Sequence, residues 1–340
     1  MTLQINTQVI VTGAIVGAAT IFGYYNYKKY VQNKIPTRWE PIGHVAELYI
    51  YPLKSGRRLG IKSAKVTEYG LQSEEPELCN FRDRCLLIYK EGINEYKTAM
   101  THPKILFIET NVVDGNHFSL SVSGMNTLIF EVPKSDQKYK EIVMWNNEKV
   151  PTIDCGDEVA EWISTYLLGN SNGLRLGYHD GKHKRNILKY FAEYKKLFPK
   201  LDNSVGGMYS DLATALIMTE ASVRDLQERL PNSDVSVHNF RPNFVIDGDL
   251  QPYTEDEWDW IKIGDVVFRN VMLCGRCALT TINPETAEFS KKYEPITTMR
   301  KYRTVTKIGS GPASPTMGIY AGIKLKGIVK LKDTVYVGKH

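Results

Sequence analysis

The chain has 340 residues, of which 42% are apolar, so it can build one large or two modest packed domains and is not a disordered chain. The formal net charge of +5 is small for this length and gives no reason to expect nucleic-acid binding. Five cysteines, an odd number, make a poor disulfide framework and favour a reducing compartment.

The first element in chain order is an uncharged apolar run from Val9 to Tyr25. Its length is at the short end of the roughly 17–25 residues that a spanning helix needs. No Lys or Arg precedes it, whereas Lys28, Lys29 and Lys34 follow it, unlike a secretory signal or a matrix-targeting peptide. These flanks predict a single-pass anchor with the C-terminal body in the cytosol. A short anchor with basic residues behind it favours the mitochondrial outer membrane over the endoplasmic reticulum. The alternative to an anchor is that the apolar run forms a buried core helix.

The body that follows the basic linker is mostly strand-like. Apolar, aromatic or alternating runs predict strands at residues 45–53, 85–89, 105–113, 118–122 and 128–132. Helical spacing predicts a helix at residues 159–167, capped by Asp154 or Asp157 and stopped at Gly169. A connector is expected at residues 174–201 and a second helix from 219 to about 230. Further strands are expected at residues 240–246, 265–273, 318–325 and 327–337.

This order of elements predicts a β-rich α+β protein with two barrel-like β parts and a few helices, preceded by one N-terminal transmembrane helix. The anchor and linker would take residues 1–40, and the two β parts residues 42–170 and 185–338. The sequence contains no glycine-rich dinucleotide or P-loop motif, no H-E-x-x-H and no G-x-S-x-G. The enzyme classes that depend on these motifs are therefore disfavoured.

Cys274-Gly275-Arg276-Cys277 is the most conspicuous chemical motif. A zinc knuckle would need a second pair at matching spacing, which Cys79 and Cys85 do not supply. A thioredoxin-type pair should open a helix, but a strand-like run follows here. Two interpretations remain: a pair of buried core thiols, or one thiolate bound to a metal-bearing cofactor. In the second case Arg276 is expected to lower the thiol pKa.

Five segments, spread in order from about residue 42 to the C-terminus, carry a family resemblance. They are YPLKSGRRLG, FRDRCLLIY, DCGDEVAEWIS, NFRPNFVIDG and CGRCALTTINPET. They resemble the mitochondrial amidoxime-reducing component family, part of the molybdenum cofactor sulfurase C-terminal (MOSC) domain superfamily. The resemblance implies an N-terminal MOSC β-barrel over residues 42–170 and the MOSC domain itself over residues 185–338.

The resemblance also implies a site. It implies a molybdenum cofactor (molybdopterin-bound molybdenum, not pyridoxal phosphate) whose metal is held by Cys277, with Asp211 as a second catalytic residue nearby. It assigns the cofactor contacts, position by position, to Lys54, Ser55, Arg84, Ser210, Arg241, Asn243 and Arg276. Leu212 and Ala213 depart from the hydroxyl residues that are common in the family. Some contacts to the cofactor or the substrate are therefore expected to be missing.

The activity implied by the resemblance is the reduction of N-hydroxylated compounds, such as amidoximes and hydroxylamines. The N–OH oxygen would leave as water, with electrons from cytochrome b5 and NADH-cytochrome b5 reductase. A mildly basic surface suits an acidic donor. One alternative is a cofactor carrier or sulfur-transfer module without reductive turnover, which electron uptake would distinguish. The other is a membrane-anchored binding protein without a metal, which metal analysis would distinguish.

Overall fold

The computed structural model describes residues 22, 24, 26, 27, 30–78, 81–134, 136–231, 233–304 and 313–340. Apart from Phe22 and Tyr24, the predicted anchor at residues 9–25 lies outside the described residues. In the described part of the chain, no helix has the length and apolar character needed to cross a membrane. The anchor therefore stays a prediction from the sequence.

A closed barrel of seven strands forms the larger unit. Its strand order is β14 (Phe244–Asp247), β13 (Ala215–Thr219), β17 (Thr316–Leu325), β16 (Val266–Gly275), β15 (Trp260–Ile263), β19 (Thr334–Lys339) and β1 (Arg38–Ile50), and β1 pairs again with β14. The parallel β13–β14 pair is the exception among antiparallel neighbours, and β2 (Leu59–Gly60) adds to β1. Closure satisfies the backbone groups that an open sheet edge would leave unpaired.

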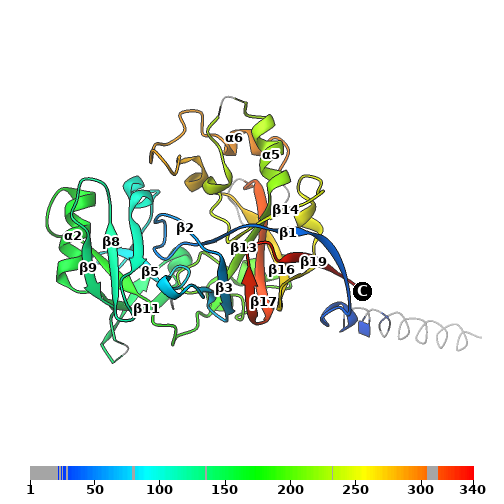
Figure 1. The fold of residues 1–340 in the computed structure, drawn as a ribbon, viewed down its shortest axis with the longest axis horizontal. Helices are drawn as coiled ribbons and strands as arrows, with labels where there is room; N and C mark the ends of the chain where they lie inside the picture. The colour runs from blue at the N-terminus through cyan, green and yellow to red at the C-terminus, as the bar shows by residue number, and fades with distance from the viewer. Residues whose placement is uncertain are drawn as a thin grey trace, which may run out of the picture.

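Strand β1 comes from the N-terminal part of the chain but lies between β19 and β14 of this barrel. Figure 1 shows it running across the barrel toward β2 and the smaller unit. It begins at Arg38, earlier than the predicted start at residue 45. At Gly43 a Cβ atom would lie 2.2 Å from the carbonyl oxygen of Asp247, so only glycine allows this close approach of two strands. The strand places the following turn, with Lys54 and Ser55, next to the barrel.

The smaller unit is built around a five-stranded sheet. Its order is β10 (Tyr139–Val143), β11 (Lys149–Asp154), β12 (Leu174–Tyr178), β5 (Leu86–Lys90) and β6 (Tyr96–Lys97), and a bridge between Glu95 and Val143 nearly closes it. A meander of β7 (Glu109–Val112), β8 (His117–Ser121) and β9 (Leu128–Glu131) and the helix α2 (Asp157–Leu168) complete the unit. The sheet of β18 (Gly327–Lys330), β3 (Ser63–Thr67) and β4 (Gly70–Ser73) joins segments from both ends of the chain. Two barrel-like β parts with few helices are thus confirmed.

Several local predictions were wrong. Residues 105–113 hold the end of a 3-10 helix, η2 (Pro103–Phe107), before β7, because Pro103 occupies the first helical position. The connector contains β12 and two short helices, α3 (Ile187–Tyr190) and α4 (Ala192–Leu197). Residues 327–337 divide into β18 and β19, which join different sheets. The cap of α2 is Gly156, at a φ of 97°, because the carboxylate of Asp154 is bound to Arg175.

The second predicted helix is α5 (Glu220–Glu228), and Thr219 accepts a capping hydrogen bond from the backbone N–H of Ser222. The predicted strand at residues 240–246 begins only at Phe244, because the preceding residues turn into the site. The other short helices are η1 (Pro76–Leu78), η3 (Trp145–Asn147), η4 (Val237–Asn239), η5 (Thr254–Glu257), η6 (Ala278–Thr281) and α6 (Ile296–Met299).

Candidate functional site

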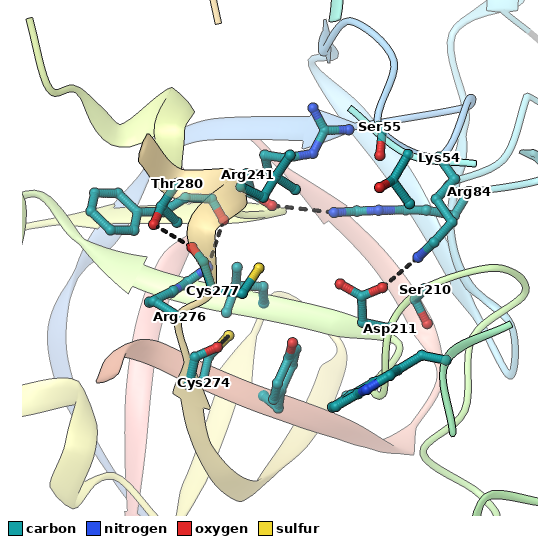
Figure 2. Close-up of a pocket in the computed structure, with 18 of the residues that line it drawn as sticks. Lys54, Ser55, Arg84, Ser210, Asp211, Arg241, Cys274, Arg276, Cys277 and Thr280 are labelled. Carbon is teal, nitrogen blue, oxygen red and sulfur yellow. Dashed lines mark hydrogen bonds and ion pairs between the residues drawn. The ribbon is translucent and has the colours of Figure 1, made fainter. Parts of the chain in front are cut away.

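A cavity of about 320 Å³ lies where loops of the barrel meet the smaller unit. All of the residues predicted for the site line it: Lys54, Ser55, Arg84, Ser210, Asp211, Arg241, Asn243, Arg276 and Cys277. Figure 2 shows the two cysteines on one side of it and Lys54, Arg84 and Asp211 on the other. The chain therefore brings together five segments that are far apart in the sequence.

The two cysteines of the C-x-x-C motif have different environments. Cys274 is the last residue but one of β16 and is only 2% exposed at the cavity wall, whereas Cys277 lies in the following loop and is exposed toward the cavity. The hydroxyl of Thr280 donates to the carbonyl of Cys277 at 2.8 Å and fixes the start of η6. A core role therefore fits Cys274 alone, and Cys277 is free to bind a ligand in the cavity.

Arg276 holds this loop in place through its guanidinium group. Its Nε donates to the carbonyl of Met317 and its Nη1 to the carbonyl of Phe240, both at 2.9 Å. Burial raises the pKa of the Cys277 thiol, and the opposing effect of Arg276 is too weak to reverse this. Arg276 thus acts in the expected direction, but desolvation outweighs it, so the expectation of an ionised free thiol is not met.

Two arginines lie against the ring of Tyr51, and they differ in how their charge is compensated. The guanidinium carbons of Arg84 and Arg241 are 4.4 and 4.3 Å from the ring centroid. Arg84 forms an ion pair with the buried carboxylate of Asp83 at 2.7 Å. Arg241 donates from Nη1 to the carbonyl of Gly56 at 2.8 Å, and burial lowers its pKa to about 10. No acidic side chain of the described residues pairs with Arg241, which thus brings a positive charge to the cavity wall.

Lys54 and Asp211 form an ion pair across the cavity wall. Lys54 Nζ also donates to the carbonyl of Tyr209 at 2.9 Å. Desolvation acts to raise the pKa of Asp211, but the neighbouring Lys54 outweighs it and holds that pKa below its usual range. Burial lowers the pKa of Lys54, and Asp211 opposes this shift. The Asp211 side chain is 51% exposed through the cavity, so we assign an ionised carboxylate.

Three buried polar atoms near the cavity have no hydrogen-bond partner within the part of the chain that the structure describes: Ser210 Oγ, Arg241 Nη2 and Tyr51 Oη. Buried polar groups are normally paired, so these atoms fit a bound polar or anionic group. Asn243, in contrast, is used by the fold, because its side chain binds the carbonyl of Tyr49 and the backbone N–H of Leu216.

Metal binding by protein side chains alone does not fit this cavity. Within the described residues, no group of three or more His, Cys, Asp or Glu side chains could hold a metal ion. A metal bound by Cys277 would therefore need further ligands from a cofactor. The charge of Arg241 and the unpartnered donors fit the anionic body of such a cofactor.

The sequence did not reveal several other lining residues. Tyr96 and Trp145 reach the cavity from the smaller unit, and no motif marks them. Burial raises the pKa of Tyr96 to about 12. Asn239 stands two positions before Arg241, in the same sequence segment, which is the signal that could have identified it. Its side-chain amide donates to the carbonyls of Thr280 and Ile282 and joins the two loops.

Two family descriptions match the amino-acid sequence of this chain. The MOSC N-terminal beta barrel domain matches residues 42–170, and the MOSC domain matches residues 207–336. The barrel and its cavity are therefore those of a MOSC-domain protein.

Curated relatives indicate one particular family of MOSC-domain proteins. Mitochondrial amidoxime-reducing component 1 of Danio rerio is 33% identical over 96% of this chain and 91% of its own length. The protein of the same name from Homo sapiens is 34% identical over 88% and 84%, and mitochondrial amidoxime reducing component 2 of Bos taurus is 30% identical over 88% and 84%. The chain belongs to the mitochondrial amidoxime-reducing component family.

Proposed function

We propose that this chain is a molybdenum-cofactor-dependent reductase that removes the N–OH oxygen of amidoximes and hydroxylamines. The observation that carries the proposal is the exposed Cys277 thiol in a cavity that also contains the uncompensated charge of Arg241 and the unpartnered Ser210 Oγ. The names of the relatives, which describe them as amidoxime-reducing, support the same reaction.

The cofactor would be held from two sides. Cys277 would bind the metal, and its thiol loses its proton on coordination. Arg241 and Ser210, with Arg84 and Ser55, would contact the polar and anionic body, because arginine suits phosphate and planar polar rings. When bound, the cofactor supplies the two-electron redox centre.

The Lys54–Asp211 pair would handle protons beside that centre. Breaking an N–O bond and releasing its oxygen as water consumes two protons. Asp211 is a weak proton donor at neutral pH because its pKa lies below the usual range. Lys54 Nζ holds a proton directly against Asp211. We infer that Asp211 orients the substrate by accepting its hydrogen bonds, and that Lys54 is the proton donor.

The location and the electron donor extend this proposal. The relatives are named as mitochondrial components, which supports a mitochondrial site. The apolar run from Val9 to Tyr25 supports single-pass anchoring in the outer membrane with the body in the cytosol. Cytochrome b5 and its NADH-dependent reductase would deliver the electrons.

The test measures the molybdenum content of the full-length chain and its reduction of benzamidoxime with cytochrome b5 and its reductase. Wild type should bind molybdenum and turn over, and Cys277→Ser should lose turnover. Cys155→Ser, which makes the same atomic change outside the cavity, should keep it. Unchanged turnover in Cys277→Ser refutes the role of the thiolate. Molybdenum without turnover indicates a carrier, and absence of molybdenum indicates a binding protein.

A further inference from the structure

A second cavity of about 180 Å³ adjoins the first one at the cysteine loop. Gly275, Arg276, Cys277, Trp145 and Tyr320 line both cavities. The walls of the second cavity alone are formed by two hydroxyl residues, Ser314 and Thr316, and mainly by apolar and aromatic ones: Tyr194, Phe198, Leu212, Met272 and Leu273. The exposed Cys277 therefore stands at the border between a cavity lined by the charged side chains of Lys54, Asp211 and Arg241 and a second one whose own walls are largely apolar.

Aromatic rings from two units of the fold form one wall. Trp145 belongs to η3 of the smaller unit, and its ring lies edge-on to that of Tyr194 on α4, with centroids 5.8 Å apart. Phe198 follows α4, and its ring centroid is 6.5 Å from that of Tyr194. Such spacings are typical of packed aromatic pairs. The wall is thus made of rings that support each other.

The chemistry of this cavity selects an uncharged ligand. Among the described residues that line it, there is no carboxylate and no lysine, and Arg276 donates to the carbonyls of Met317 and Phe240. An apolar cavity of roughly 150 Å³ can hold a benzene ring, so 180 Å³ accommodates one ring with a small substituent. A charged group would lose its hydration there without an ion-pair partner.

We propose that this second cavity binds the aryl part of the substrate and leaves its N–OH group at Cys277. The inference rests on the proposed function and assigns a specificity-determining subsite to it: the ring of an N-hydroxylated substrate would lie against Phe198, Tyr194 and Leu212. Leu212, one of the two departures from the family pattern, lines this cavity and is 1% exposed, which makes its wall apolar. The other, Ala213, lines the first cavity.

The test compares two probes, benzamidoxime and acetamidoxime, which differ in the ring. We expect Phe198→Ala to lower the ratio of kcat/KM for benzamidoxime to that for acetamidoxime about tenfold, and Phe198→Leu to lower it less. Leu197→Ala is the matched control, because Leu197 is the preceding residue, is 47% exposed and does not line the cavity. It should keep the wild-type ratio. Calorimetric titration with benzamidoxime should show the same order of affinities.

The outcomes separate this inference from the proposed function. If wild type reduces both probes and Phe198→Ala keeps the wild-type ratio and affinity, the aryl site is refuted and the reductase function stands. If wild type reduces neither probe but binds benzamidoxime through Phe198, the proposed function fails and the aryl site is supported.

Discussion

Arg185 and Glu148 form an ion pair behind the cavity, and replacing Arg185 tests how that wall is held. Each side chain is 2% exposed, and Arg185 Nε donates to Glu148 Oε1 at 2.9 Å. The same guanidinium donates to the carbonyl of Ser210 and, at 3.2 Å, to the carbonyl of Asp211. Arg185 therefore joins the smaller unit to the loop that contains two of the predicted site residues.

Arg185→Met removes the positive charge and leaves the carboxylate of Glu148 buried without a cation. Breaking a buried pair in this way costs about 3–5 kcal/mol. This is a large share of the roughly 5–15 kcal/mol by which domains are stable, so the variant should fold but have a much smaller free energy of unfolding. The double variant Arg185→Met with Glu148→Leu should recover part of the loss, because no charge remains buried.

Urea denaturation followed by tryptophan fluorescence measures these free energies of unfolding. Lys196→Met is the matched control, because it breaks the pair with Glu193, whose two side chains are 70% and 72% exposed. Exposed pairs contribute about 0–1 kcal/mol. If Arg185→Met loses no more than Lys196→Met, the pair does not hold the wall. If the double variant is less stable than Arg185→Met, the unpaired carboxylate is not the cause of the loss.

Two further predictions concern acid sensitivity and a helix end. Burial lowers the pKa of His179 to about 4, below the value of about 6.5 in unfolded chains. Neutral His179 therefore stabilises the folded state by about 3 kcal/mol at most; this contribution is complete above a pH of about 6.5 and is lost as the pH falls toward 4. Protonation disrupts the hydrogen bond that Nδ1 accepts from the backbone N–H of Gly181. Urea titrations at several pH values should show that the free energy of unfolding depends less on pH in His179→Gln than in wild type. His117→Gln, at an exposed histidine, should keep the wild-type dependence. If His179→Gln and wild type show parallel dependence on pH, His179 is not the source of the acid sensitivity. Gly169→Ala should cost about 1 kcal/mol, because Gly169 ends α2 at a φ of 74°. Gly115→Ala, where an added Cβ also meets no atom within 4 Å, should cost less than about 0.5 kcal/mol, and equal losses in the two variants contradict the backbone argument.

Helices α2 and α5 could be predicted because their signals are local. Apolar residues at helical spacing define one buried face, and Gly169 and Thr219 mark an end and a start. Local signals failed where a neighbouring group competes, as at Asp154, whose carboxylate binds Arg175 and does not cap α2. The position of β1 could not be predicted, because alternation along a strand indicates its buried face and not its partner.

The sequence by itself determined the residue types of the site and the run proposed as an anchor. The C-x-x-C motif, the arginines and the lysine–serine turn are all visible in it, and their family resemblance gathered them into one list. Only the tertiary structure decided that Cys277 faces a cavity while Cys274 is buried, that Arg241 lacks an acidic partner, and that an aromatic wall stands beside the thiol. The physical reason is that exposure, charge compensation and cavities depend on contacts between segments distant in the chain, which spacing along the sequence does not encode.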